Sequence, residues 1–438
     1  MIRMLRKRLL NLLWTLPAAL LLYLLYYVGH PNDEFDGYER VEELPPGFLP
    51  SKGPAAEVKT VAMTHSTVSV KPTQKSCQRL NSFVFIKTHK SGSTTMIAPF
   101  QKYAYLYNLT MMVPSSNNNI HLSWPFRFMP SVSNMPAPGN RKFQALVNHI
   151  VFNKTSIEPL MDVKTAYITI LREPAPHLVS AYQYFSVNFD NVFLRKSLTD
   201  FELFLSDPTK HDPVPTWMQK MKNTEILSLT RNLQSADLGL HYTEFDNLTS
   251  VRSFVNGIEK DFSIILVLER LAESLVLMKR KFCWSMEDVI HVNKNVQKIA
   301  WNWNFRNISQ HLIPKIYEWN NVDTELYRMA NDKLNKLRLG ETDLDEEIKV
   351  YNNINTKVSQ YCAGSVRHWI DTVPIPEPLV IDSTKFNNRF VVDRRVCGLL
   401  VVPEEDFTLL HKCRQYPDYK QCNDQTYKVN ELRSLVGH

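Results

Sequence analysis

The sequence predicts an α/β domain with a central parallel sheet flanked by helices, preceded by one N-terminal transmembrane helix. From residue 81 onward, short apolar runs typical of buried strands alternate with segments of helical periodicity, which indicates βαβ units. Residues 9–28 form an uncharged, mostly apolar run that is long enough to cross a bilayer as a helix. The 438 residues allow one large domain or two smaller ones.

Each predicted strand is a short apolar run, and the four strands cover residues 82–87, 143–148, 166–171 and 262–268. Predicted helices cover residues 94–105, 174–185, 201–205, 271–282 and 320–336. After these elements we predict an acidic, exposed bend at 340–347 and short strands at 390–393 and 399–402. Because ligands of parallel sheets bind beyond the carboxyl ends of the strands, the polar residues that follow the first three strands are expected to share one pocket.

The N-terminal run is predicted to be an uncleaved signal anchor. Basic residues precede it and acidic residues follow it, so the positive-inside rule places the N terminus in the cytosol and the rest of the chain in the lumen. A cleaved signal peptide is the alternative, but the run is long for one and no small-x-small site closes it. We therefore predict a cytosolic tail at 1–8, the anchor at 9–28, a lumenal stem at 29–76 and a folded domain at 77–438.

The net charge is +7, and its distribution along the chain predicts no nucleic-acid partner. Four of these charges precede the apolar run, so the remainder carries only 7 − 4 = +3. Such a weak bias suits a local anion pocket better than an extended basic face. With 44% hydrophobic and 22% charged residues, the composition is that of a globular protein and not of a disordered chain.

Six cysteines without Cys-x-x-Cys spacing predict disulfides in a secretory-pathway chain rather than a zinc site. Cys413 and Cys422 can close a short loop, and the other pairings stay open among the 15 possible. Glycosylation is predicted at the four Asn-x-Ser/Thr sites, Asn108, Asn153, Asn247 and Asn307.

Residues 83–96 are the stretch around which the chain is organised. A buried strand, a tight Ser/Gly/Thr turn and a helix N terminus follow one another, so free N–H groups and the positive end of the helix dipole meet at one spot. The loop lacks the Gly-Lys-Ser/Thr ending of a Walker A motif. A surface turn rich in Ser and Thr is the alternative. The candidate anion-binding residues are Lys87, Lys90, Ser91, Gly92, Ser93, Thr94 and Thr95.

A second anion site is predicted where the strand at 166–171 ends. Arg172 supplies a rigid fork of donors for phosphate oxygens, and Ser180 lies about two helical turns further on. The alternative is a structural ion pair for Arg172 and a helix-face role for Ser180. Two such sites in one chain favour a ligand with two phosphate groups.

These motifs resemble known proteins. His89–Thr94 is similar to the Pro-Lys-Ser-Gly-Thr-Thr loop of sulfotransferases that use 3′-phosphoadenosine 5′-phosphosulfate (PAPS), and Arg172 with Ser180 resembles their 3′-phosphate clamp. Over about residues 80–335 the chain resembles the galactose-3-O-sulfotransferase family. The segments that carry this second resemblance are 87–90, 147–149, 171–174, 232–239, 273–278 and 283–289.

The resemblance implies a P-loop NTPase-like sulfotransferase fold, with residues 77–438 as the catalytic domain. It also implies a single-pass type II protein of the Golgi membrane. The implied activity is transfer of a sulfuryl group from PAPS to the 3-hydroxyl of galactose on glycolipids or glycoprotein glycans, so the implied partner is a galactose-terminated acceptor. No oligomeric state is predicted.

The reaction predicts roles for individual residues. Lys90 would neutralise the leaving phosphate, Ser91–Thr95 would hold the 5′-phosphate, and Arg172 with Ser180 would hold the 3′-phosphate. An imidazole suits the general base. We favour His149, for which a satisfied core histidine is the alternative. His89 is the rival base, and would otherwise position the sulfate or the acceptor. No metal is predicted, since no ligand cluster is recognisable.

Trp284, Glu287 and Asp288 are weaker candidates for acceptor contacts, and core packing beside a disulfide is the favoured reading of Trp284. Two other functions stay open: a different Golgi carbohydrate sulfotransferase of the glycosaminoglycan type, and a non-catalytic glycan-binding membrane protein. The second is less favoured, because the candidate site residues are all present.

Overall fold

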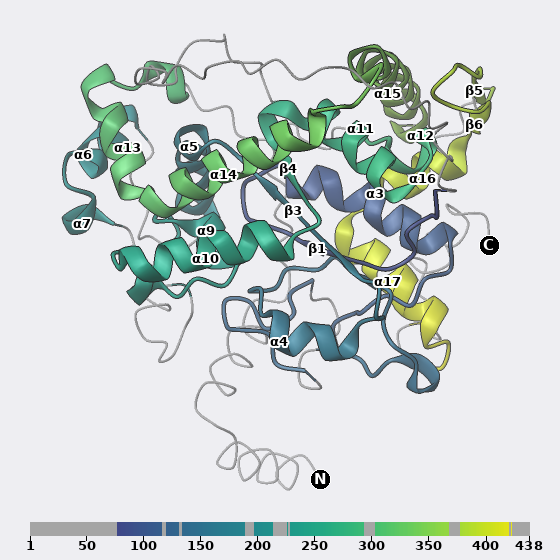
Figure 1. Cartoon of the computed structure of the whole chain (residues 1–438), viewed down its shortest axis with the longest axis horizontal. Helices are drawn as coiled ribbons and strands as arrows, with labels where there is room; N and C mark the ends of the chain where they lie inside the picture. Colours follow the sequence, from purple (N-terminus) through teal and green to yellow (C-terminus); the bar gives the residue numbers. More distant parts are fainter. Residues whose placement is uncertain are drawn as a thin grey trace, which may run out of the picture.

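The computed structural model describes residues 77–115, 120–130, 134–188, 197–212, 226, 228–292, 303–367, 377–419 and 422. A four-stranded parallel sheet forms the centre of the fold, in the order β2-β1-β3-β4 (Figure 1). Its strands are β1 (Phe83–Ile86), β2 (Ala145–Leu146), β3 (Ala166–Leu171) and β4 (Ile264–Val267). Every residue of the four strands is buried, which explains their unbroken apolar sequences. The predicted α/β class with a parallel sheet is confirmed.

The strand order fixes where a ligand can bind. The chain leaves β1 for β2 on one side and then crosses back to β3 on the other side. Such a reversal opens a crevice between β1 and β3 at their carboxyl ends, which is the usual ligand position in open parallel sheets. The loops that follow Ile86 and Leu171 both start at this crevice.

Helices surround the sheet. Those at predicted positions are α3 (Ser93–Leu106), α5 (Pro174–Asn188), α6 (Leu198–Ser206), α11 (Leu271–Phe282) and α14 (Asn321–Arg338). The others are α4 (Lys154–Ile157), α7 (Pro208–His211), α9 (Leu233–Asp237), α10 (Leu248–Asp261), α12 (Met286–Val289), α13 (Ile313–Trp319), α15 (Leu344–Arg367), α16 (Arg394–Val401) and α17 (Glu404–Gln415). Short 3-10 turns lie at Pro138–Asn140, Glu158–Leu160, Tyr242–Glu244, Leu268–Arg270, Phe305–Asn307 and Gln310–Leu312.

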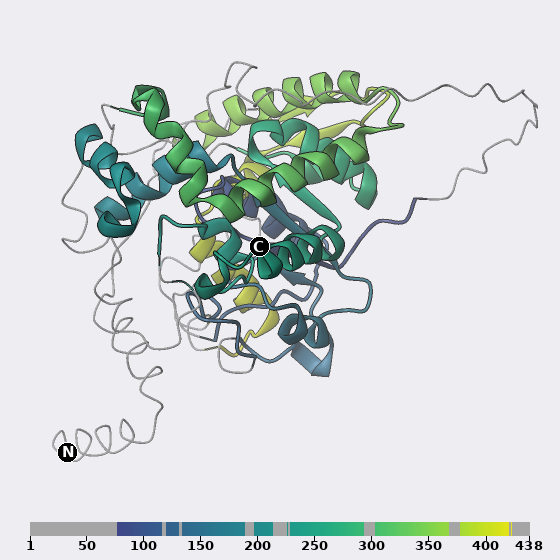
Figure 2. The ribbon, with the colours of Figure 1, turned by 60° about the vertical axis from the view of Figure 1, so that its left-hand side comes forward.

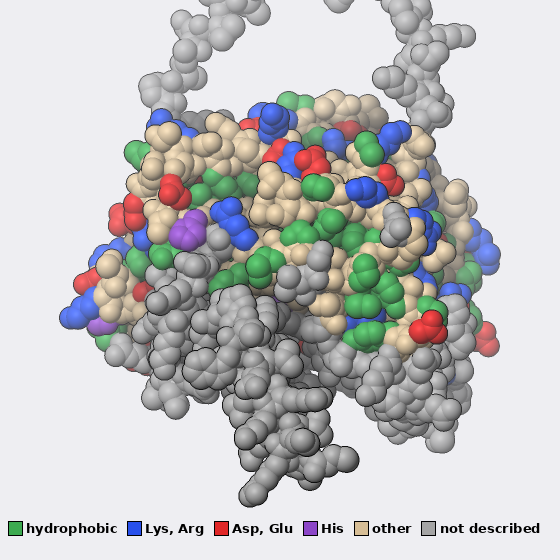
Figure 3. Space-filling model, turned by 90° about the horizontal axis from the view of Figure 1, so that it is seen from below, with side chains coloured by type: hydrophobic (Ala, Val, Ile, Leu, Met, Phe, Trp, Pro, Cys, Tyr) green, Lys and Arg blue, Asp and Glu red, His purple; other side chains and the backbone are tan. Residues whose placement is uncertain are grey.

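The helices form two groups beside the sheet. In Figure 1, α6, α7 and α13 lie on the left, while α11, α15, α16 and the antiparallel hairpin of β5 (Leu379–Ile381) and β6 (Phe390–Val392) lie on the right. Figure 2 shows from the side that the long green helices run above the sheet and the yellow C-terminal helix lies lower. From below, the surface mixes hydrophobic side chains with both signs of charge (Figure 3).

Three predictions of secondary structure are wrong in whole or in part. The predicted strand at 399–402 falls mostly in helix α16, because Asp393 accepts a bond from the Val396 N–H and starts a helix there. A short apolar run does not distinguish strand from helix. The predicted bend at 340–347 becomes α15 from Leu344, since Glu347 is buried against Lys279 and Arg280. The predicted strand at 143–148 shrinks to the two residues of β2.

All six cysteines form disulfides: Cys77–Cys283, Cys362–Cys397 and Cys413–Cys422. The short loop predicted for the last pair is confirmed. The first pair connects the start of the described chain to the end of α11, and the second connects α15 to α16.

The predicted tail, anchor and stem at 1–76 lie outside the described residues. Within the described ranges, which start at residue 77, no helix is both long and apolar enough to span a bilayer.

Candidate active site

The loop after β1 turns directly into α3. Gly92 stands just before the helix at φ +75°, and an added Cβ would lie 2.7 Å from the Leu268 side chain, so this turn requires glycine. No side chain caps the N terminus of α3. Because the first N–H groups of a helix have no acceptor within the helix, this end of α3 is suited to bind an anion.

The second predicted anion site lies against this loop. Arg172 follows β3, and its guanidinium donates to the backbone oxygen of Lys90 at 3.2 Å. The Lys90 ammonium lies 4.0 Å from the ring centre of Tyr184 on α5. Ser180 is buried on the same helix. The structure therefore brings the two cations predicted to bind phosphates to one end of the sheet.

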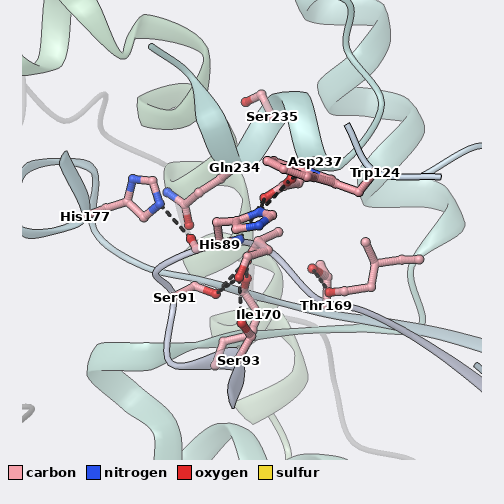
Figure 4. A network of polar contacts seen from close by, with 12 residues as sticks. His89, Ser91, Ser93, Trp124, Thr169, Ile170, His177, Gln234, Ser235 and Asp237 are labelled. Carbon is pink, nitrogen blue, oxygen red and sulfur yellow. Dashed lines mark hydrogen bonds and ion pairs between the residues drawn. The ribbon is translucent and has the colours of Figure 1, made fainter. Parts of the chain in front are cut away.

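The hydroxyls of the loop do not all face the same way. Ser91 and Ser93 both donate to the backbone oxygen of Thr88, at 2.9 and 2.7 Å, so they brace the loop (Figure 4). Thr94 is half-buried at the start of the helix. The Thr95 hydroxyl is buried and has no hydrogen-bond partner among the described residues. An unsatisfied buried hydroxyl at a helix N terminus suits a phosphate oxygen.

Lys87 has a partner from a distant part of the chain. Its ammonium forms a buried ion pair with Glu404 at the start of α17, and both side chains are almost fully enclosed. The pair joins the end of β1 to the C-terminal part of the chain. This geometry gives Lys87 a structural partner, and its phosphate contact stays a prediction.

His89 is held from three directions. Its backbone N–H donates to Asp237 at 2.7 Å, and its ring Nδ1 lies 2.9 Å from the same carboxylate. The ring Nε2 of His177 contacts the backbone oxygen of His89 at 2.9 Å. Trp124 donates its indole N–H to Asp237 at 3.0 Å and packs on the His89 ring, with centroids 4.5 Å apart (Figure 4).

His149 stacks on His89. Their ring centres lie 4.3 Å apart, and the ring centre of His121 lies 5.1 Å from that of His149. Burial lowers the pKa of His149 well below its ordinary value, and the charge of Lys87 adds to this effect. Burial likewise lowers the pKa of His121 to about 3. Both rings are therefore neutral near pH 7. The Nδ1 of His149 is buried and has no hydrogen-bond partner among the described residues.

The ring nitrogens of His89, His121 and His149 lie within 4.8 Å of one another, close enough to be considered as metal ligands. The sequence did not suggest this group, because the three histidines lie far apart along the chain. Imidazole binds a metal through lone pairs in the ring plane, and the planes of His89 and His149 are only 22° from parallel. A metal ion within bonding distance of both rings could therefore not lie in both ring planes.

The short helix α9 connects both halves of the site. The Gln234 amide bonds to the backbone N–H and oxygen of Arg172, at 2.8 and 3.0 Å, and Asp237 holds His89. Asp323 on α14 in turn accepts bonds from the N–H groups of Gln234 and Ser235. Sequence reasoning missed Asp237 as a site residue. It lies in the 232–239 segment that carried the family resemblance, which was the available signal.

The weaker acceptor candidates have structural roles. Trp284 is buried, stacks on Tyr103 at 4.0 Å and follows the disulfide-bonded Cys283, so the favoured reading of core packing is confirmed. Asp288 accepts the N–H of Ser285 and so caps α12, and it also forms an ion pair with Arg79. Glu287 lies beside it, where burial raises the pKa of its carboxyl.

Three of the predicted glycosylation asparagines, Asn108, Asn247 and Asn307, are exposed. Asn153 is half-buried, and its amide donates to the Ser156 hydroxyl at 2.9 Å. Glycosylation of these residues stays a prediction.

A parallel sheet with a glycine loop, an uncapped helix N terminus and two adjacent cations defines a class of α/β proteins suited to bind a phosphorylated ligand at the β1/β3 crevice. The comparison with protein families narrows this class. The galactose-3-O-sulfotransferase family matches residues 5–378, so the chain belongs to that family.

Individual relatives are distant. This chain is 26% identical to the galactosylceramide sulfotransferase of Homo sapiens, over 69% of this chain and 68% of the relative. It is 28% identical to the Mus musculus protein of the same name, over 58% of this chain and 57% of the relative. It is 25% identical to galactose-3-O-sulfotransferase 3 of Mus musculus, over 64% of this chain and 63% of the relative. These alignments leave about a third or more of each relative uncovered.

Proposed function

We propose that this protein transfers a sulfuryl group from PAPS to the 3-hydroxyl of galactose on a glycolipid or glycoprotein glycan. The observation that carries the proposal is the contact between the Arg172 guanidinium and the Lys90 loop at the β1/β3 crevice. Two cationic groups on neighbouring strand ends match a donor with two separate phosphate groups. The family membership supplies the class of reaction.

The residues at the crevice fit such a nucleotide. The N terminus of α3 has no side-chain cap, and the buried Thr95 hydroxyl lacks a partner within the described part of the chain. These groups would hold the 5′-phosphate. Lys90 would lie beside the bridging oxygen, which stays on this phosphate when its bond to sulfur breaks. Arg172 and Ser180 would hold the 3′-phosphate. Ser91 and Ser93 contribute their backbone N–H groups, because their hydroxyls brace the loop.

The bound donor supplies an activated sulfuryl group, and the protein has to remove the proton from the acceptor hydroxyl. His89 and His149 lie stacked beside the Lys90 loop and are the candidates for this task. Lys90 would stabilise the negative charge that develops on the leaving phosphate.

We further propose that the chain is a single-pass type II protein of the Golgi membrane, with its catalytic domain in the lumen. The uncharged run at 9–28, the four glycosylation sequons and the three disulfides support this location together. A galactose-terminated glycan or glycolipid would be the acceptor.

The test is incubation of the secreted lumenal domain with radiolabelled PAPS and a panel of β-galactosides. We expect label on the 3-hydroxyl of terminal galactose. Label on a uronic acid or glucosamine would point instead to a glycosaminoglycan-type sulfotransferase. No transfer to any glycan, with PAPS binding absent, would refute the proposal.

Two variants test the donor site. Lys90→Ala should lower kcat by roughly 10²- to 10³-fold, because one charged stabiliser of the transition state is lost. Arg172→Ala should weaken binding of adenosine 3′,5′-bisphosphate by roughly 10- to 100-fold, because charged hydrogen bonds typically contribute this much to binding. Arg252→Ala, on the exposed face of α10, is the matched control and should change neither quantity. Unchanged binding in Arg172→Ala would refute the assignment of the 3′-phosphate site.

A further inference from the structure

The stacked rings of His89 and His149 have different surroundings, and this difference distinguishes their roles. His89 has a carboxylate partner at its Nδ1, and its side chain keeps 10% of its surface exposed. His149 has no carboxylate partner among the described residues, and its burial makes the protonated form costly. A general base has to take up a proton in the reaction, so the ring beside a carboxylate is the better base.

We propose that Asp237 is a positioning residue that makes His89 the general base, an inference that rests on the proposed sulfuryl transfer. The Asp237 carboxylate accepts a hydrogen bond from the N–H at Nδ1 of His89, so the lone pair of the ring lies on Nε2. It also accepts the His89 backbone N–H, so it fixes both the ring and the backbone of the same residue. Carboxylate–imidazole pairs of this kind set the tautomer and stabilise the imidazolium that forms.

Asp237 is itself held rigidly. Its side chain is fully buried, and Trp124 donates to its Oδ1 at 3.0 Å. Its backbone oxygen accepts the N–H of Phe152 at 2.9 Å, which fastens the end of α9. Gly239, two residues later, lies at φ +94° directly against the Phe152 backbone, where a side chain would not fit. The carboxylate is thus fixed before any acceptor binds.

Nε2 of His89 takes the proton from the galactose 3-hydroxyl while that oxygen forms a bond to the donor sulfur. The bond between the sulfur and the phosphate oxygen breaks, and its electron pair stays on the phosphate of adenosine 3′,5′-bisphosphate. The positive charge that arrives on the His89 ring then lies beside the negative charge of Asp237. His149, stacked on the His89 ring, stays neutral during this step.

The experiment compares Asp237→Asn, Trp124→Phe and the unmodified lumenal domain. Asp237→Asn keeps the shape but loses the charge, so kcat should fall by roughly 10²- to 10⁴-fold, by analogy with the carboxylate of the serine-protease triad. The affinity for adenosine 3′,5′-bisphosphate should change less than about threefold. Trp124→Phe removes one hydrogen bond to the carboxylate, and should lower kcat by roughly 3- to 10-fold.

A second readout does not depend on activity. With ¹⁵N-histidine labelling, the ring of His89, assigned through its loss in His89→Gln, should show a protonated Nδ1 and an unprotonated Nε2 at pH 8. Asp237→Asn should change this pattern.

A failure of the proposed function and a failure of the positioning role would give different results. If the unmodified protein transfers no sulfate, the proposed function fails. If the unmodified protein is active and Asp237→Asn keeps its full kcat, or if His89 carries its proton on Nε2, the positioning role is wrong. A parallel loss of nucleotide affinity and folding in Asp237→Asn, with no kcat loss in Trp124→Phe, would also refute it, because Asp237 would then be purely structural.

Discussion

The two halves of the site are built in different ways. On the phosphate side, Lys90–Thr95 and Arg172–Ser180 are short segments, each running from a strand end into a helix, and their geometry follows from local backbone structure. On the histidine side, partners come from distant parts of the chain: Asp237 lies 148 positions from His89 and 113 from Trp124. One half is therefore determined by local sequence and the other by tertiary packing.

Lys87 gives the sharpest test of this division, because it lies in the phosphate loop but contacts a distant helix. Lys87→Met should destabilise the protein by about 3–5 kcal/mol, since Glu404 would remain buried without a partner. Replacing both residues in Lys87→Met/Glu404→Leu should recover most of this loss. Urea unfolding gives the free energies.

The double variant also decides the role of Lys87. With the structure restored, it should bind adenosine 3′,5′-bisphosphate as tightly as the unmodified protein. A tenfold or larger loss of affinity in the stable double variant would show that Lys87 contacts the nucleotide after all, and the two halves of the site would then be less distinct.

The same division explains what the sequence predicted. The strand ends, the glycine turn and the spacing of Arg172 and Ser180 are local features, so β1, β3, α3 and α5 were predicted close to their observed positions. A pocket at the carboxyl ends of the strands followed from the rule for parallel sheets, whereas its position between β1 and β3 depends on a strand order that the sequence did not predict. Local sequence is enough here because a buried strand and a helix start each have their own residue pattern.

Tertiary contacts account for the errors. Nothing near Lys87 in the sequence indicates Glu404, and nothing near His89 indicates Asp237 or Trp124. Likewise α15 begins within an acidic segment that looks solvent-exposed, because Lys279 and Arg280 on another helix neutralise Glu347. Such pairs become visible only when the chain is folded.

Gly92 tests whether the phosphate side depends on local backbone geometry. Gly92→Ala should destabilise the protein by about 1–3 kcal/mol, because alanine is strained at φ +75° and its Cβ would press on Leu268. Gly257→Ala is the matched control: this glycine lies within α10 and has no atom within 4 Å of the added Cβ, so it should be stabilising by about 0.5–1 kcal/mol. Equal effects in thermal unfolding would mean that the turn tolerates a side chain.

The third test concerns the histidine side and its dependence on pH. Burial lowers the pKa of His177, which contacts the His89 backbone, to about 3. Below pH 6.5 the unfolded chain takes up a proton on this ring and the folded protein does not. The free energy of unfolding therefore falls as the pH falls from 6.5 toward 4, by about 1.4 kcal/mol per pH unit for this one residue.

His177→Gln keeps an N–H donor for the His89 oxygen but removes the titration, so its unfolding free energy should depend less steeply on pH by that amount. His311→Gln, at an exposed position, is the matched control for the loss of a histidine and should leave the slope unchanged. Urea unfolding between pH 7.5 and 5.0 measures all three slopes, and an unaltered slope in His177→Gln would show that this ring is not held neutral by the fold.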